Sequence, residues 1–139
     1  MVNQSLTPHP DLANPITILI VDDVLDNIRL LSRILVKRGY QTRKALNGSM
    51  ALTAIKASKP HLILLDVQMP EMSGFELCQL IKSHPDTADI PIIFVSANDD
   101  SSEKRKAIQF GGVDYIPKPF NIEKLVEVIK KQIELTLIN

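Results

Sequence analysis

Three short runs of apolar residues constrain the fold of this chain more than any other feature of its sequence. They span Ile16–Val21, Leu62–Leu65 and Ile90–Val95. Their apolar residues largely follow one another directly instead of alternating with polar ones, which is typical of strands covered on both faces in a parallel sheet. We therefore expect these three segments to form the buried centre of such a sheet.

Two further segments, Gln41–Ala45 and Asp114–Pro117, have the length of strands but fewer apolar residues. We predict them as strands that are less buried than the first three. Pro117 has no N–H to donate to a ladder, which favours a position at the edge of the sheet for the second segment.

The segments between the predicted strands carry apolar residues at helical spacing. From Asp26 to Arg38, for example, Ile28, Leu31 and Leu35 share one face. Further helices are predicted over Met50–Ala57, over Phe75–Lys82, over a segment with Ser101 or Ser102 as its cap, and over a segment capped by Asn121. Strand and helix alternate five times, which predicts an α/β domain with a five-stranded parallel sheet and helices on both faces.

The composition limits the partners and the location that we expect for the protein. Sixteen basic and sixteen acidic residues give a formal net charge of zero, so charge provides no reason to expect binding to nucleic acid or to an anionic membrane. Cys78 is the only cysteine, which excludes an internal disulfide framework. No apolar run approaches the roughly 18 residues that a membrane span needs. We expect a cytoplasmic protein.

The length of 139 residues indicates one domain. Residues 1–14 are polar and interrupted by prolines, and they lack the basic and apolar regions of a secretory signal. We expect them to form a flexible lead, with the domain spanning residues 15–137.

Polar side chains follow four of the predicted strands at the point where each strand ends. Asp22 and Asp23 follow the first strand, Asp66 the third, Ser96 the fourth and Lys118 the fifth. The carboxyl ends of parallel strands lie along one edge of the sheet, and open α/β proteins place their ligands at that edge. We therefore expect these five side chains to meet in one crevice.

Three carboxylates in one crevice repel one another. Two unit charges ~4 Å apart interact by about 4 kcal/mol at an effective dielectric constant of 20. The crevice therefore needs a cation, and ligands that are all oxygen favour Mg²⁺. A lysine, a hydroxyl and Mg²⁺ around a carboxylate are what phosphoryl transfer requires, because negative charge spreads over the transferred oxygens. Asp66 is the predicted nucleophile, which would form an aspartyl-phosphate.

Four motifs in this order resemble the receiver domain of two-component response regulators. They are "VDD" at residues 21–23, "LLDVQMPEMSG" at 64–74, "VSA" at 95–97 and "DYIPKPF" at 114–120. The resemblance covers about Ile16 to Ile133. It implies the flavodoxin-like doubly wound fold with strand order 2-1-3-4-5, similar to that of the chemotaxis response regulator.

The resemblance also implies roles for individual residues in the chemistry. Asp66 would be the phosphoacceptor, and Asp22 and Asp23 would hold Mg²⁺ together with Asp66 and the main-chain carbonyl of Gln68. Lys118 would bind the phosphoryl oxygens, and its bond to Pro119 would be cis.

Three further roles implied by the resemblance concern switching and phosphoryl lifetime. Ser96 would move toward the phosphoryl group, and Tyr115 stands at the aromatic position whose ring changes between exposed and buried states. Gln68 and Asn98 stand at positions that influence how fast the phosphoryl group is hydrolysed. Simpler interpretations stay open: Asp22 or Asp23 as a helix cap, and Tyr115 as a half-exposed tyrosine without a signalling role.

The resemblance implies that a sensor histidine kinase or a histidine phosphotransfer protein donates the phosphoryl group, and that the domain modifies only itself. It also allows a homodimer through the fourth and fifth helices. The chain ends just after the fifth predicted helix, so we expect no output domain and no direct nucleic acid binding within it. A single-domain regulator and a piece of a longer protein both stay open.

Two alternative functions remain at this point. A hydrolase of the haloacid dehalogenase type also forms an aspartyl-phosphate on Mg²⁺, but its D-x-D pattern after the first strand is replaced here by "DDV". A flavodoxin-like binder of flavin mononucleotide would need phosphate donors in the first loop, where "DDVLDN" presents acids that repel phosphate.

Overall fold

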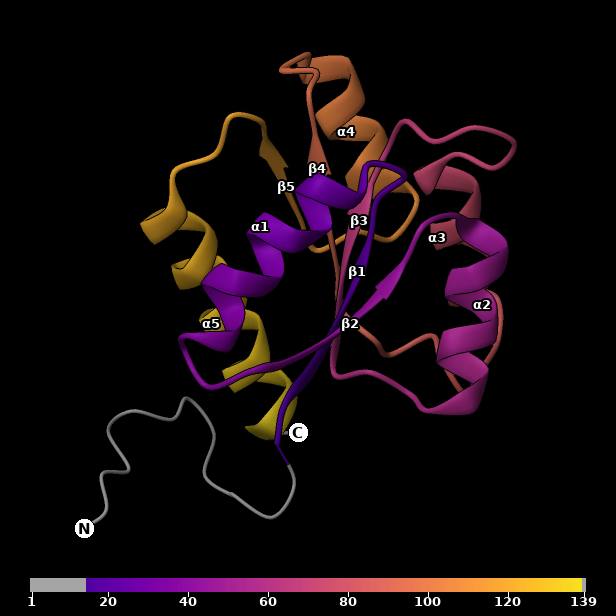
Figure 1. The fold of residues 1–139 in the computed structure, drawn as a ribbon. Coiled ribbons are helices and arrows are strands. Elements are labelled where there is room, and N and C mark those ends of the chain that lie inside the picture. Colours follow the sequence, from indigo (N-terminus) through magenta and orange to yellow (C-terminus); the bar gives the residue numbers. More distant parts are fainter. Residues whose placement is uncertain (1–14, 139) are drawn as a thin grey trace, which may run out of the picture.

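A computed structural model describes residues 15–138 of the chain. These residues form a parallel sheet of five strands in the order β2-β1-β3-β4-β5, with helices on both faces (Figure 1). The strands are β1 (Thr17–Val21), β2 (Gln41–Ala45), β3 (Leu62–Asp66), β4 (Ile92–Ser96) and β5 (Asp114–Pro117). The predicted fold class and strand order are confirmed. The predicted lead of residues 1–14 lies outside the described residues.

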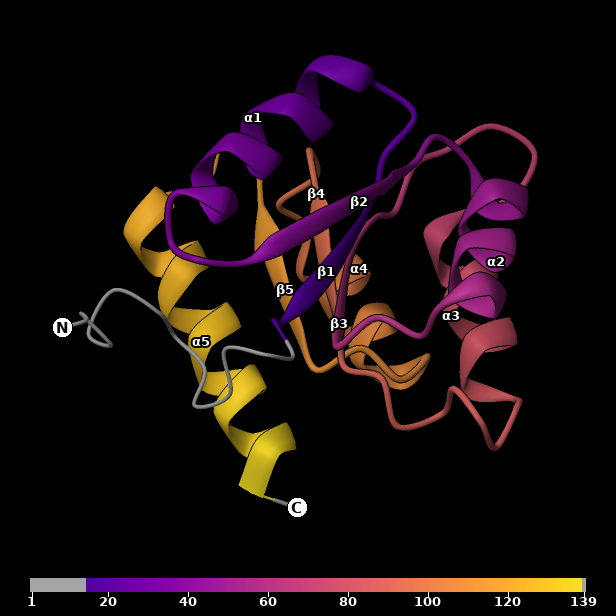
Figure 2. The same ribbon diagram turned by 60° about the horizontal axis from the view of Figure 1, so that its bottom comes forward.

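The helices divide into two layers. They are α1 (Leu25–Val36), α2 (Gly48–Ala57), α3 (Gly74–Lys82), α4 (Ser101–Gln109) and α5 (Ile122–Ile138). One core cluster joins the sheet to α2, α3 and α4, and the other joins it to α1 and α5, as the turned view in Figure 2 also shows. Among residues 15–138, no helix is both long enough and apolar enough to cross a membrane.

The burial of the strands follows from these two layers. All five residues of β3 and all five of β4 are buried, because helices cover both of their faces. In β2, at one edge of the sheet, Ala45 alone is fully buried. Pro117 ends β5 at the opposite edge, where its missing N–H leaves no gap in a ladder. The prediction from the apolar runs, and the edge position of Pro117, are therefore confirmed.

The fourth helix begins differently from the prediction. Its cap is Asp100, whose carboxylate accepts a hydrogen bond from the backbone N–H of Ser102 at 2.9 Å. Ser101 and Ser102, which we expected to cap this helix, lie inside its first turn, so that prediction is wrong. Asp and Ser are about equally good caps, so composition alone does not decide between neighbouring candidates.

Candidate functional site

Three carboxylates meet at the carboxyl edge of the sheet. Asp22 follows β1 and Asp66 ends β3, and these neighbouring strands pair in parallel, with Val21 opposite Leu65. One carboxylate oxygen from each of Asp22, Asp23 and Asp66 lies within 4.8 Å of the others. Asp22 and Asp66 are 2% and 8% exposed, whereas Asp23 is open to solvent. The three carboxylates therefore lie together as predicted, and the cluster is open to solvent on the side of Asp23.

The environment of Asp66 disfavours its charged form. Burial, followed by the negative charge of Asp22, raises the pKa of Asp66 from its ordinary value of 3.8 to about 6. Lys118 and a hydrogen bond from the backbone of Gln68 act in the opposite direction but do not cancel the effect. A cation beside Asp66 would favour the charged form and so offset the effects of burial and of Asp22.

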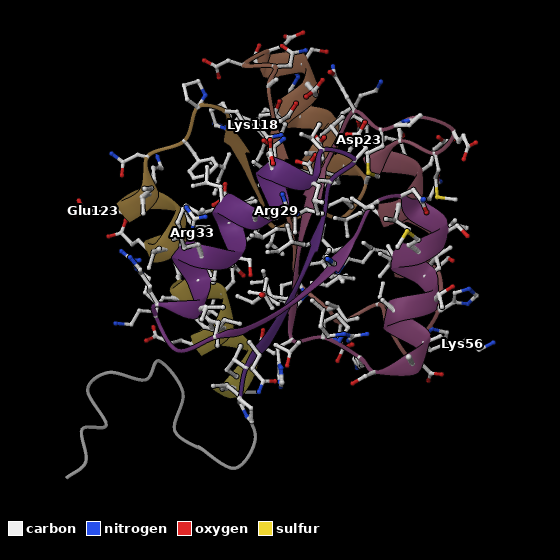
Figure 3. All side chains as sticks on the ribbon, viewed as in Figure 1. Asp23, Arg29, Arg33, Lys56, Lys118 and Glu123 are labelled. Carbon is white, nitrogen blue, oxygen red and sulfur yellow. The ribbon has the colours of Figure 1, made fainter. Side chains whose placement is uncertain are left out.

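Lys118 follows β5 and brings a positive charge to the same carboxyl edge of the sheet. Its Nζ lies 3.1 Å from Asp22 Oδ2 and 4.0 Å from Asp66 Oδ1. The backbone N–H of Lys118 donates to the carbonyl of Ser96 at 2.6 Å, which ties the loop after β5 to the end of β4. The bond between Lys118 and Pro119 is cis, as expected. Figure 3 shows Lys118 and Asp23 at the same end of the molecule.

Asp22 is held in place by groups that sequence reasoning missed. Its Oδ1 accepts the backbone N–H of Val24 at 2.9 Å, and its Oδ2 accepts the side-chain amide of Asn27 at 3.1 Å. Asn27 lies in the first turn of α1, so the start of this helix orients the carboxylate. No sequence signal distinguished Asn27 from an ordinary helix residue.

The loop after Asp66 is drawn tightly against the site by the start of α3. Ser73 and Glu76 form a capping box around this helix start, with hydrogen bonds of 2.8 and 3.2 Å. The N–H of Gly74 donates to Val67 O at 2.8 Å. A Cβ at Gly74 would lie 2.2 Å from the backbone oxygen of Asp66, so no residue larger than glycine fits. The first residue of α3 therefore packs directly against the backbone of Asp66 and Val67.

The donor atoms fit a Mg²⁺ ion. Carboxylate oxygens are hard ligands, and Mg²⁺ usually binds one or two carboxylates and keeps several waters. The exposed side at Asp23 offers room for such waters. Gln68, predicted to contribute its carbonyl, is exposed in the loop directly after the site. Asp22, Asp23 and Asp66 form the one cluster of this kind found among the described residues.

Ser96 lies at the same edge, but its hydroxyl is turned toward α4. Ser96 follows Phe94 by two residues, which places both side chains on the face of the sheet that packs against Ala107 of α4. The Ser96 Oγ donates to Glu103 Oε1 at 2.6 Å. Sequence reasoning did not identify Glu103.

Tyr115 is buried, not half-exposed. It is 4% exposed, and its hydroxyl lies 2.6 Å from Glu103 Oε1 and also contacts the backbone oxygen of Asn98. The interpretation of Tyr115 as a half-exposed tyrosine is therefore wrong, because α4 and the loop before it cover the ring position. Asn98 is half-buried, and its amide donates to Glu103 Oε2 at 3.2 Å.

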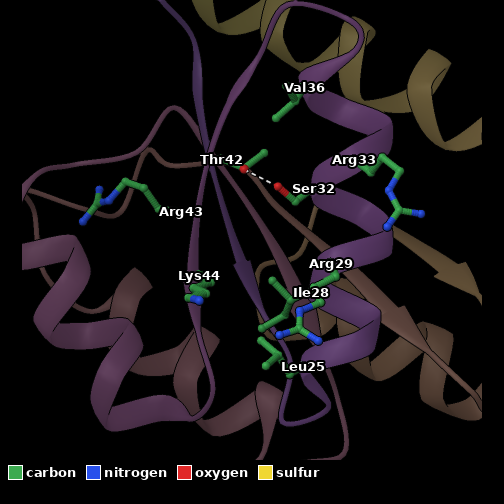
Figure 4. Close-up of a pocket in the computed structure, with 9 residues that line it drawn as sticks. All are labelled: Leu25, Ile28, Arg29, Ser32, Arg33, Val36, Thr42, Arg43 and Lys44. Atoms are coloured by element: carbon green, nitrogen blue, oxygen red, sulfur yellow. Dashed lines mark hydrogen bonds between the residues drawn. The ribbon is translucent and has the colours of Figure 1, made fainter.

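A pocket of about 710 Å³ lies elsewhere, between α1 and the edge strand β2 (Figure 4). Ser32 and Thr42 both line the pocket, and their hydroxyls form a hydrogen bond of 2.6 Å. Its lining includes Arg29, Arg33 and Lys44 and no carboxylate. The pocket therefore offers no negative charge to a cation, and the acidic cluster remains the candidate metal site.

Comparison with known proteins points to one family. The model of the response regulator receiver domain matches residues 18–130. The transcriptional regulatory protein YvrH of Bacillus subtilis is 39% identical over 121 residues, which cover 86% of this chain and 50% of that protein. The response regulator PleD of Caulobacter vibrioides is 36% identical over 104 residues, which cover 75% of this chain and 23% of PleD. The chain thus spans half or less of these relatives.

Solved structures agree with this result. The signal receiver domain of a signal transduction histidine kinase from Syntrophus aciditrophicus is 35% identical, with a TM-score of 0.79. The similarity covers 85% of this chain and 89% of that one.

Proposed function

This chain belongs to the receiver domains of two-component response regulators, and from that membership we propose that Asp66 accepts a phosphoryl group in a Mg²⁺-dependent reaction. The observation that carries this assignment is the cluster itself. Asp66 ends a fully buried strand, shares the crevice with two other carboxylates, and faces the ammonium of Lys118.

Asp22, Asp23 and Asp66, with the carbonyl of Gln68, would hold the Mg²⁺ ion. When bound, the ion neutralises the carboxylates and the oxygens of the incoming phosphoryl group. An oxygen of Asp66 attacks the phosphorus of a phosphohistidine, the P–N bond breaks, and the imidazole leaves with its electron pair. Lys118 is 4.0 Å from Asp66 Oδ1, close enough to bind an oxygen of the transferred group after a small movement.

The remaining predicted residues act after transfer in this proposal. Ser96 donates its hydroxyl to the phosphoryl group and shifts the arrangement of α4, β5 and α5, with Tyr115 packed between them. Gln68 and Asn98 control access of water to the phosphorus. We assign residues 15–137 to this domain.

We propose that the domain catalyses its own phosphorylation and dephosphorylation and turns over no external substrate. The donor is a sensor histidine kinase or a histidine phosphotransfer protein in the cytoplasm. The surface formed by α4, β5 and α5 transmits the change to an output, including to a second copy of the chain in a homodimer.

Intact-mass measurement with an acyl phosphate as donor tests the assignment of Asp66. With Mg²⁺ present, the wild-type chain should gain one phosphoryl group, and a chelator should prevent the gain. Asp66→Asn should gain none. Asp26→Asn is a matched control, because Asp26 is an exposed acid near the site that lies outside the cluster. An equal gain in Asp66→Asn would overturn the assignment.

A further inference from the structure

The hydroxyls of Ser96 and Tyr115 meet at one carboxylate. Glu103 Oε1 lies 2.6 Å from Ser96 Oγ and 2.6 Å from the Tyr115 hydroxyl. Its other oxygen, Oε2, accepts the side-chain amide of Asn98 at 3.2 Å. Glu103 thus contacts side chains from β4, from β5 and from the loop between β4 and α4, although it belongs to none of them.

The contact with Ser96 occupies the only proton that this hydroxyl has to donate. Ser96 is fully buried, so water does not replace Glu103 as the acceptor. The Ser96 Oγ also accepts the backbone N–H of Asn98 at 3.2 Å, which holds the oxygen toward α4. A phosphoryl oxygen on Asp66 therefore gains a hydrogen bond from Ser96 only if the bond to Glu103 breaks.

The bond to be broken is stronger than an ordinary one. Hydrogen bonds to an ionised acceptor contribute about twice as much as bonds between neutral groups. Helix α4 also has few apolar contacts, since Ala107 is its one buried residue. The polar contacts of Glu103 are therefore a large part of what fixes α4 against β4 and β5.

We propose that Glu103 is a positioning residue that opposes the switch, because its carboxylate competes with the phosphoryl group for the hydroxyl of Ser96. The inference rests on the proposed function of Asp66. Phosphorylation releases Ser96 from Glu103, while the bond between Glu103 and Tyr115 remains. Replacing the carboxylate by a neutral amide makes this release easier, so the switched state becomes more favourable.

Binding of beryllium fluoride, which mimics a phosphoryl group on a carboxylate, measures this competition at equilibrium. With Mg²⁺ present, Glu103→Gln should bind it about tenfold more tightly than the wild type, which corresponds to ~1.4 kcal/mol. Ser96→Ala should bind it more weakly than the wild type. In the Ser96→Ala background, Glu103→Gln should have no further effect, because the competition needs the hydroxyl.

Asp100→Asn is the matched control. It removes one negative charge from the same helix start and keeps a good capping residue, but Asp100 bonds to Ser102 and not to Ser96. Its affinity for beryllium fluoride should stay within twofold of the wild type. An equal gain in Asp100→Asn, or a gain from Glu103→Gln that persists without the Ser96 hydroxyl, would show a general charge effect and overturn the inference.

The remaining outcomes separate this inference from the proposed function. Wild-type affinity in Glu103→Gln refutes competition but leaves Asp66 as the acceptor. No binding by the wild-type chain, or equal binding by Asp66→Asn, refutes the assignment of Asp66 and the inference with it.

Discussion

The ammonium of Lys118 lies closer to Asp22 than to Asp66, at 3.1 Å against 4.0 Å. In this arrangement Lys118 compensates the more deeply buried of the two carboxylates. The side chain of Asp22 is only 3% exposed, so we expect this ion pair to contribute to the stability of the fold.

Lys118→Met should therefore destabilise the chain. The substitution leaves Asp22 and Asp66 buried without their cation, and we expect a loss of about 1–3 kcal/mol in the free energy of unfolding in chelator at pH 8. Lys59→Met is the control, since the pair of Lys59 with Asp89 is largely exposed and should cost less than ~0.5 kcal/mol. Urea unfolding measures both, and equal losses would contradict a special role for Lys118.

Asp66→Asn should stabilise the chain when no metal is bound. The folded state raises the pKa of Asp66 from 3.8 to about 6. Because the folded state binds this proton more tightly than the unfolded state, the proton adds to the free energy of unfolding. That contribution is fully present below about pH 4 and is lost as the pH rises through 6. The gain from Asp66→Asn should therefore be about 1–3 kcal/mol at pH 8 in chelator, and it should vanish near pH 4. Urea unfolding at the two pH values tests this, and a gain that is independent of pH would contradict it.

Asp23→Asn should weaken Mg²⁺ binding at least tenfold, because it removes one of the three carboxylates that we propose as ligands. The exposed position of Asp23 means that stability in chelator should change by less than ~0.5 kcal/mol. Calorimetric titration with Mg²⁺ measures the affinity, with Asp26→Asn as the control. Unchanged affinity would exclude Asp23 as a ligand.

Gly74→Ala and Gly48→Ala form a matched pair, because each glycine is the first residue of its helix. At Gly74 the new Cβ would meet the backbone of Asp66 and Val67, at 2.2 and 2.9 Å. At Gly48 it would meet the side chain of Met72, which can move. Gly74→Ala should cost at least ~1 kcal/mol and weaken Mg²⁺ binding, whereas Gly48→Ala should change stability by less than ~1 kcal/mol. Thermal unfolding and Mg²⁺ titration distinguish the two, and equal effects would contradict the close approach at Gly74.

Glu103→Gln should make the Tyr115 phenol easier to ionise. Burial, followed by the hydrogen bond with Glu103, raises the pKa of Tyr115 to about 12. The protonated phenol therefore adds to the free energy of unfolding below pH 10, and this contribution is lost as the pH rises toward 12. In a Tyr40→Phe background, which leaves Tyr115 as the one tyrosine, absorbance should show more phenolate at pH 11 in Glu103→Gln than with Glu103 intact. An identical phenolate fraction would mean that the carboxylate does not act on the phenol.

The three central strands were predictable because their apolar residues are largely continuous, as burial on both faces of a parallel sheet favours. The starts of the helices were less predictable. Asp100, Ser101 and Ser102 are all good caps, and only the path of the backbone after β4 makes Asp100 the one that caps α4. Ile90 was expected to begin β4, but its N–H bonds to Thr87 in the preceding turn, so the strand starts at Ile92.

The sequence by itself determined that three acids, a lysine and a serine share one edge of a parallel sheet, because residues that follow parallel strands must lie there. Only the tertiary structure decided which acceptor the Ser96 hydroxyl uses. Glu103 lies seven residues after Ser96 and twelve before Tyr115, and neither spacing predicts a contact between a strand end and a helix. A hydrogen bond depends on the distance and direction between two atoms, and here those are set by how α4 packs against β4 and β5.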